Sequence, residues 1–216
     1  MSQNKRYKYF PKNLPSQKTI QKHFNKHDKT MALIVKRVGP IKLKPNKKYF
    51  LVLCRSIISQ QISVKSAEAI LRRFLKLFPK QFPSPQSVQE TSDSKLHRAG
   101  LSKQKVAYMK NLSEKFIDKS INPRSFQFMK NEEIVENLTQ VYGIGSWTAE
   151  MFLIFSLGRP NVFPFGDLGI RSAIKKIYKL KTIPSAKDLK LYREKWAPYE
   201  TVGSWYAWRS LNLKLS

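Results

Sequence analysis

Apolar residues recur along most of this chain with the three- to four-residue spacing of helices that bury one face. Residues 47–59 illustrate the pattern, with Phe50, Leu51, Cys54 and Ile57 placed for one buried side. No segment shows the apolar–polar alternation of a half-buried strand, so the pattern predicts an all-α protein. The predicted helices span 17–25, 29–38, 47–59, 64–78, 85–90, 93–99, 102–119, 131–141, 146–157, 168–179, 186–196 and 200–212.

The order of these helices predicts three regions. Residues 1–15 are basic, aromatic and interrupted by proline, and we expect them to form an N-terminal arm. Segments 16–45 and 158–216 together are expected to form a terminal helical subdomain, and residues 46–157 a central helical bundle. A groove between these two bundles is expected.

The chain is strongly basic. Lysine and arginine number 41 against 14 aspartates and glutamates, a formal net charge of +27. An excess of that size indicates a polyanionic partner, either nucleic acid or an acidic membrane surface. The 4 tryptophans, 9 tyrosines and 13 phenylalanines exclude a disordered basic tail. Because the charge is scattered over many helices instead of following one amphipathic helix, nucleic acid is favoured over a membrane.

Cysteine and histidine usage excludes several kinds of site. Cys54 is the only cysteine, so a disulfide framework, a zinc ribbon and an iron–sulfur cluster held by four cysteines of this chain are excluded. His23, His27 and His97 show no metal-ligand spacing with carboxylates, so no metal is expected. No apolar stretch is long enough to span a bilayer, and no signal-type segment follows the N-terminus. The sequence therefore predicts a soluble intracellular protein.

Residues 141–149, with the sequence Val-Tyr-Gly-Ile-Gly-Ser-Trp-Thr-Ala, carry the most specific local signal. One predicted helix enters this run and another leaves it, and Gly143 and Gly145 allow a sharp turn between them. Bare N–H groups at a helix start bind phosphate without any side chain. A glycine pair also occurs where two helices simply pack closely, so the turn alone leaves both interpretations open.

Asp167 adds a second element to this signal. It stands twenty residues after Trp147, at the end of a loop that holds Pro160, Pro164 and Gly166. Together with the two-glycine turn, this loop and aspartate resemble the helix-hairpin-helix DNA glycosylases, a superfamily named for its Gly/Pro loop and catalytic Asp. The resemblance extends over roughly residues 30–210, and the helices that flank Ser59-Gln60-Gln61-Ile62-Ser63 look like the opening helices of the 3-methyladenine DNA glycosylase II family.

The resemblance implies a fold and a DNA-binding mode. The fold would be all-α, with two helical subdomains flanking a cleft that binds DNA and holds the active site. The helix-hairpin-helix would span 132–157 and bind phosphates through Gly143, Gly145, Ser146 and Thr148, with a monovalent cation on its carbonyls in some members. No other cofactor is implied.

The polar turn 59–63 would enter the minor groove and fill the space that a flipped base leaves. Gln61 falls at the wedge position and Gln60 lies beside it. An amide there can also hydrogen-bond the orphaned opposite base, whereas an apolar wedge unstacks bases by shape alone. The alternative is that two glutamines simply solvate a turn between helices.

The resemblance makes Asp167 the catalytic candidate. A carboxylate near C1′ can stabilise the positive charge that builds on the sugar during N-glycosidic cleavage, and it can orient or deprotonate a water. The alternative is an N-cap aspartate for the helix predicted from residue 168. The two roles are compatible, because a cap fixes the carboxylate and a helix N-terminus favours negative charge.

Trp147 occupies the position at which base-excising lyases of the superfamily carry the Schiff-base lysine. An indole cannot form an imine, so that lyase chemistry is excluded at this position. An indole can stack on a flipped alkylated purine, which is cationic and electron-poor. Trp208 falls where the family places a second base-contacting tryptophan, although core packing of the last helix explains it equally well. Tyr142 and Met151 are weaker candidates for the base pocket.

These expectations define a monofunctional DNA glycosylase for base excision repair. It would hydrolyse alkylated purines of the 3-methyladenine and 7-methylguanine type out of double-stranded DNA, as a monomer, after extruding the base. It would reside with the DNA, in a bacterial nucleoid or a eukaryotic nucleus. Leu168-Gly169 follows the aspartate where other members are bulkier, which leaves the lesion range open. The alternatives are deaminated or oxidised bases as substrates, or a non-catalytic protein that binds lesions.

Overall fold

The computed structural model describes residues 14–213, so most of the predicted N-terminal arm lies outside the described residues. Every regular element among the described residues is helical, which confirms the all-α prediction. The elements are α1 (Gln17–His27), α2 (Lys29–Val38), α3 (Tyr49–Ser59), α4 (Val64–Leu75), η1 (Pro79–Gln81), α5 (Pro85–Glu90), α6 (Asp93–Arg98), α7 (Lys103–Ile117), η2 (Phe126–Phe128), α8 (Asn131–Thr139), α9 (Ser146–Phe152), η3 (Leu153–Leu157), α10 (Leu168–Ile177), α11 (Ala186–Trp196) and α12 (Glu200–Ser210).

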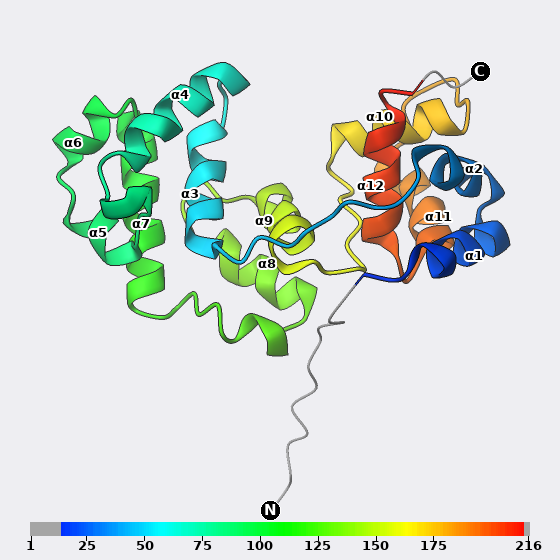
Figure 1. The fold of residues 1–216 in the computed structure, drawn as a ribbon, viewed down its shortest axis with the longest axis horizontal. Coiled ribbons are helices and arrows are strands. Elements are labelled where there is room, and N and C mark those ends of the chain that lie inside the picture. The colour runs from blue at the N-terminus through cyan, green and yellow to red at the C-terminus, as the bar shows by residue number, and fades with distance from the viewer. Residues whose placement is uncertain (1–13, 214–216) are drawn as a thin grey trace, which may run out of the picture. The chain divides into compact units, whose positions relative to one another are not determined.

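The described chain divides into two compact units (Figure 1). The central unit comprises Asn46–Phe152, and the terminal unit combines residues 14–45 with residues 153–213. The predicted boundary lay after residue 157, whereas the chain leaves the central unit after Phe152. The terminal unit is therefore built from both ends of the described chain.

The central unit is organised around α3 and α7, drawn in cyan and green in Figure 1. Helix α3 packs against α4, α7 and α9, and α7 also packs against α5 and α6. Leu53, Cys54 and Ile57 of α3 and Met109 of α7 are completely buried. The apolar spacing that predicts these helices thus corresponds to the side that each one buries.

Helix α12 is the centre of the terminal unit and packs against α2, α10 and α11. Residues 200–207 are buried without interruption, as expected for a helix with neighbours on several sides. Gly203 is required for this packing, because a Cβ there would lie 2.5 Å from the fully buried ring of Trp196. Close packing of α12 on α11 therefore depends on one missing side chain.

A buried carboxylate joins three elements of the terminal unit. Asp28 caps α2 by accepting a hydrogen bond from Met31 N at 3.0 Å. Its Oδ2 accepts from the hydroxyl of Tyr178 and, at 3.2 Å, from Nε1 of Trp196. Burial, and secondarily the charge of Asp28, raises the pKa of Tyr178 well above its usual range. The tyrosine therefore stays a neutral donor to the aspartate.

Several predicted helices end earlier in the structure, and two of them end three or more residues before the predicted position. The prediction of a helix over 64–78 is three residues too long, because Phe78 precedes Pro79 and is extended, with φ −118° and ψ 147°. The prediction of one α-helix over 146–157 is wrong from Leu153, where the chain continues as a π-helix. An α-helix and a π-helix would both bury apolar residues in the segment from Leu153 to Leu157. Apolar periodicity alone therefore could not distinguish the two kinds of helix.

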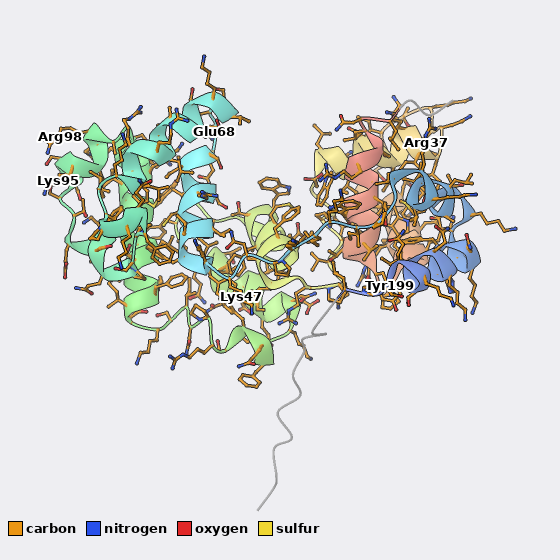
Figure 2. All side chains as sticks on the ribbon, in the orientation of Figure 1. Arg37, Lys47, Glu68, Lys95, Arg98 and Tyr199 are labelled. Atoms are coloured by element: carbon orange, nitrogen blue, oxygen red, sulfur yellow. The ribbon has the colours of Figure 1, made fainter. Side chains whose placement is uncertain are left out.

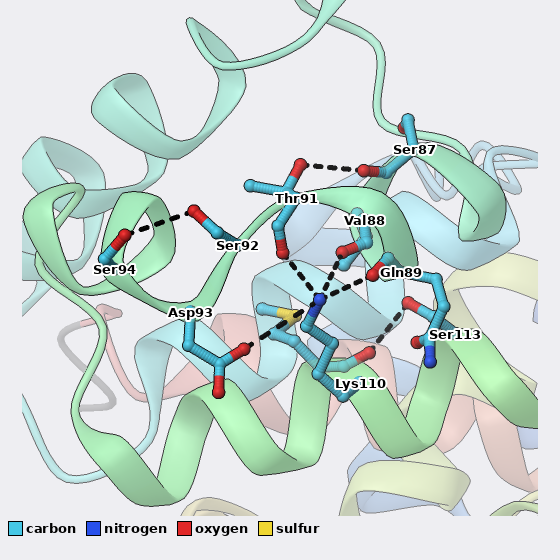
Figure 3. A network of polar contacts seen from close by, with 10 residues as sticks. Ser87, Val88, Gln89, Thr91, Ser92, Asp93, Ser94, Lys110 and Ser113 are labelled. Carbon is cyan, nitrogen blue, oxygen red and sulfur yellow. Dashed lines mark hydrogen bonds and ion pairs between the residues drawn. The ribbon is translucent and has the colours of Figure 1, made fainter.

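Three lysines bind backbone carbonyls at helix ends. The ammonium of Lys110 contacts the carbonyl oxygens of Val88, Gln89 and Thr91 at the end of α5, with Asp93 at 3.9 Å (Figure 3). Lys176 binds three carbonyls at the end of α12 in the same way. The third lysine, Lys105, donates hydrogen bonds to the carbonyl oxygens of Ile58 and Gln60 at the end of α3. A cation at a helix C-terminus satisfies carbonyls that the helix itself leaves unpaired.

Candidate functional site

A cavity of about 680 Å³ in the central unit brings the predicted hairpin and wedge turn together. Its lining comes from α3, the turn after α3, α7 and the hairpin that leads into α9. The cavity therefore joins segments that are far apart in the sequence. The residues that line it are Ser56, Ser59, Gln60, Gln61, Gln104, Lys105, Tyr108, Gly143, Gly145, Trp147, Thr148 and Met151.

The hairpin turn depends on Gly143 in particular. Its φ is +80°, and a Cβ there would lie 2.2 Å from the ring of Tyr108 on α7. Gly145 has no positive φ, and a Cβ there would meet nothing within 4 Å. The sequence argument that both glycines make the sharp turn therefore holds for the first of them only. Gly145 keeps the approach to the start of α9 open.

The start of α9 offers backbone donors to a ligand. The first hydrogen bond of this helix runs from Ala149 N to the carbonyl of Gly145 at 3.1 Å. The N–H groups of Ser146 and Thr148 therefore precede the helical ladder. Ser146 is exposed, whereas Thr148 as a whole residue is only 8% exposed.

The two glutamines of the turn after α3 have different surroundings. Gln61 is exposed and has φ +56°, in the left-handed region that non-glycine residues rarely adopt. Gln60 is half-buried, and its Nε2 donates to the carbonyl of Gly143 at 2.7 Å. The structure thus places the Gln60 amide on the hairpin and leaves Gln61 at the exposed tip of the turn.

Large aromatic side chains are exposed around the hairpin. Trp147 is 50% exposed and Tyr142 is 64% exposed, while Met151 is half-buried in the cavity wall. The backbone N of Tyr142 donates to the side chain of Asn111 at 3.0 Å, which fixes the entry to the turn. Exposed tryptophan and tyrosine beside a cavity are typical of a binding surface.

Asp167 lies in the terminal unit as the N-cap of α10. Its Oδ1 accepts hydrogen bonds from Ile170 N at 2.7 Å and from Nε1 of Trp208 at 2.9 Å. The residue is 8% exposed. The carboxylate is thus oriented by a helix N-terminus and an indole, both of which favour its negative charge.

Trp208 can hydrogen-bond Asp167 because Gly169, which lies between the two side chains in space, has no side chain of its own. A Cβ on Gly169 would lie 3.0 Å from Oδ1 of Asp167 and 3.2 Å from the indole of Trp208. Gly169 stands where other family members are expected to carry bulkier residues. It therefore makes room for the hydrogen bond between Trp208 and Asp167. The other side of the indole stacks on Phe155, with ring centroids 5.7 Å apart. Phe155 is 38% exposed, and the sequence argument missed it.

The sequence argument also gave no role to Gln104, Lys105, Tyr108 or Asn111 of α7. The first three line the cavity, and Asn111 binds the hairpin backbone. Their signal in the sequence is spacing: Lys105, Tyr108 and Asn111 are three residues apart and share one side of α7. These three residues are half-buried, and they lie along the edge of the buried face that Val106, Met109 and Leu112 form.

Positive charge is distributed over both units. Figure 2 shows nitrogen-tipped side chains on helices of each, among them Arg37 on α2 and Lys95 and Arg98 on α6. Within residues 14–213 no three His, Cys, Asp or Glu side chains gather as metal ligands. A monovalent cation on the hairpin carbonyls stays a prediction. No helix in this range is long and apolar enough to cross a membrane.

Comparison with known families gives one match that covers most of the chain. Residues 54–198 match the sequence profile of the HhH-GPD superfamily of base excision DNA repair proteins. The matched range contains the wedge turn, the hairpin and Asp167.

Individual relatives extend the similarity to nearly the whole chain. DNA-3-methyladenine glycosylase 1 of Schizosaccharomyces pombe is 34% identical over 196 residues, which cover 88% of this chain and 86% of the relative. The solved structure of the 3-methyladenine DNA glycosylase of that yeast in complex with abasic DNA superposes with a TM-score of 0.79 at 33% identity, over 90% of this chain and 97% of that one. A DNA-3-methyladenine glycosidase from Bacillus halodurans gives a TM-score of 0.81 at 32% identity, with 94% and 92% covered.

Proposed function

The chain belongs to the HhH-GPD superfamily of base excision DNA repair proteins, among the 3-methyladenine DNA glycosylases, and from that premise we propose that it hydrolyses the N-glycosidic bond of alkylated purines in duplex DNA. We further propose that it does so as a monomer, in the compartment that holds the DNA. The products are a free base and an abasic strand that stays intact.

The carboxylate of Asp167 carries this proposal. Hydrolysis builds positive charge on the deoxyribose, and a fixed negative charge close to that sugar lowers the barrier. Asp167 is fixed by Ile170 N and by Trp208 Nε1, so it does not have to reorganise as the charge develops. A residue that only capped a helix would not need a second donor from an indole in another helix, forty-one residues along the chain.

The central unit supplies the DNA-handling part of the proposal. The backbone of the hairpin holds phosphates at Gly143, Gly145, Ser146 and Thr148, contacts that position DNA without reading its sequence. Gln61 enters the stack from the exposed tip of its turn and replaces the extruded base.

Trp147 supports the alkylated class of base and the absence of lyase chemistry. Its indole is 50% exposed, and a purine alkylated at N3 or N7 carries the positive charge that an aromatic face attracts. Such a base is already a good leaving group, so no general acid is required. A side chain without an amine at this position cannot form a Schiff base.

The first prediction tests this function directly. Incubated with methylated duplex DNA, the protein should release 3-methyladenine and 7-methylguanine, which chromatography identifies, and should leave the abasic strand uncut. Borohydride should trap no covalent protein–DNA adduct, because Trp147 replaces the lysine. Release of deaminated or oxidised bases in place of alkylated ones would overturn the substrate class. An efficient adduct would overturn the monofunctional assignment.

The second prediction concerns the wedge. Gln61→Ala should slow release from a matched duplex about tenfold and release from a single strand much less, because extrusion costs a few kcal/mol only where the base is stacked and paired. Gln81→Ala is the matched control: Gln81 is an exposed glutamine of the same unit with φ +53°, outside the cavity. Single-turnover rates on the two substrates give the measurement. Equal effects of both substitutions would show that the turn is only a polar loop.

A further inference from the structure

One side of α7 contacts both DNA-binding turns of the central unit. Lys105, Tyr108 and Asn111 follow one another at three-residue intervals along this fifteen-residue helix. The helix is anchored by Val106, Met109 and Leu112, which are buried to 2% exposure or less. Because the helix is anchored, its side chains start from fixed backbone positions, and the segments that they hydrogen-bond are fixed as well.

Lys105 holds the wedge turn. Its Nζ donates to the carbonyl of Ile58 at 2.7 Å and to the carbonyl of Gln60 at 2.8 Å. The first of these carbonyls belongs to the last turn of α3, and the second directly precedes Gln61. Partial burial lowers the pKa of the Lys105 amine. Two charge-assisted bonds on either side of one residue fix the direction in which the chain leaves α3.

Tyr108 and Asn111 hold the hairpin. The ring of Tyr108 lies directly against Gly143, where a Cβ would be 2.2 Å away. The side chain of Asn111 accepts from Tyr142 N at 3.0 Å. These two residues fix the position of the hairpin relative to the same helix that holds the wedge turn.

Gln60 closes the arrangement. Its backbone carbonyl accepts from Lys105, and its side-chain Nε2 donates to the carbonyl of Gly143 at 2.7 Å. The wedge turn is thereby bonded to α7 and to the hairpin at one residue. Moving α7, the wedge turn or the hairpin relative to the other two would strain at least one of these hydrogen bonds.

We propose that Lys105 is a positioning residue for base extrusion, which holds Gln61 in register with the phosphate-binding hairpin. The inference rests on the proposed function for its choice of substrate. DNA phosphates gripped at the hairpin then fix the step of the duplex that Gln61 enters. The left-handed backbone of Gln61 is maintained by the bonds of Lys105 on the carbonyls before it.

The test compares two lysines that bind carbonyls in the same unit. Lys105→Met keeps the length of the side chain and removes the ammonium, and Lys110→Met does the same at the end of α5, outside the cavity (Figure 3). Each rate is measured for release of an alkylated base from a matched duplex and from the same strand unpaired. Lys105→Met should lower the duplex-to-single-strand rate ratio about tenfold, the effect of losing charged hydrogen bonds on extrusion alone. Lys110→Met should leave the ratio at the wild-type value.

A second readout does not require catalysis. With 2-aminopurine beside the lesion, its fluorescence rises when neighbouring bases unstack on binding, and Lys105→Met should reduce this rise at saturating protein. Gln60→Met removes only the bond to Gly143 from a half-buried side chain, so it remains folded and should reduce the rise to a smaller extent. An unchanged rise in both variants would overturn the role of Lys105, as would equal losses on duplex and single strand. A wild-type protein that unstacks DNA but releases no base would overturn the proposed function and leave this assignment standing.

Discussion

Replacing Asp167 with asparagine should reduce base release about 100- to 1,000-fold, the range for losing one preorganised electrostatic group in an active site. The substitution is conservative in structure. Oδ1 accepts both observed bonds, from Ile170 N and Trp208 Nε1, and the carbonyl oxygen of asparagine can accept the same two. Asparagine is also as good an N-cap as aspartate. The variant therefore removes the charge and can keep these two hydrogen bonds.

Single-turnover release from methylated duplex DNA measures this effect, and binding to DNA that contains an abasic site gives the control. Binding should persist, because the hairpin and wedge residues lie in the other unit. Trp208→Phe should have a smaller effect than Asp167→Asn, since it removes one donor and retains the carboxylate. Release by a folded Asp167→Asn protein within a few-fold of wild type would refute the catalytic assignment.

Asp28→Ala should lower the free energy of unfolding by about 3–5 kcal/mol, the largest stability effect we expect from a polar substitution. The change takes the Asp28 acceptor from the part-buried hydroxyl of Tyr178 and from Nε1 of Trp196, which keeps only a 3.4 Å bond to the Tyr178 hydroxyl, and it removes the cap of α2. Urea unfolding followed by tryptophan fluorescence measures the loss.

Asp188→Ala is the matched control for this substitution. Asp188 also accepts bonds at a helix start, from the backbone and hydroxyl of Ser185, but it is exposed. Its removal should cost far less, because water replaces the lost partner. Equal losses in the two variants would mean that the contribution of Asp28 is an ordinary cap and that the buried network adds nothing.

The parts of the fold that the sequence predicts are those set by local chemistry. Ser63, Ser102 and Ser185 cap α4, α7 and α11 through their hydroxyl groups, and Asp167 caps α10 in the same manner. Such signals act within three residues, so reading them requires no knowledge of the rest of the molecule. The hairpin is local as well, because Gly143 must adopt a positive φ within its own turn.

The parts that the sequence does not predict depend on partners far along the chain. Gln60 and Gln61 are neighbouring glutamines, and the side chain of the first binds the carbonyl of Gly143, eighty-three residues away. Lys105 is one lysine among many until the carbonyls of α3 are placed beside it. Phe155 is recognised as part of the site only because its ring stacks on the indole of Trp208. Propensity and periodicity contain no information on such pairings.

The construction of the terminal unit from both ends of the chain has a consequence for synthesis. Helices α1 and α2 leave the ribosome before α11 and α12, against which they pack. The contiguous central unit can complete its core in between. Until then Ile20, Phe24 and Val35, fully buried in the finished protein, have no partner from the later helices. Residues 14–45 contain a single acidic residue, Asp28, among many lysines, and the mutual repulsion of nascent chains so charged opposes their aggregation while they wait.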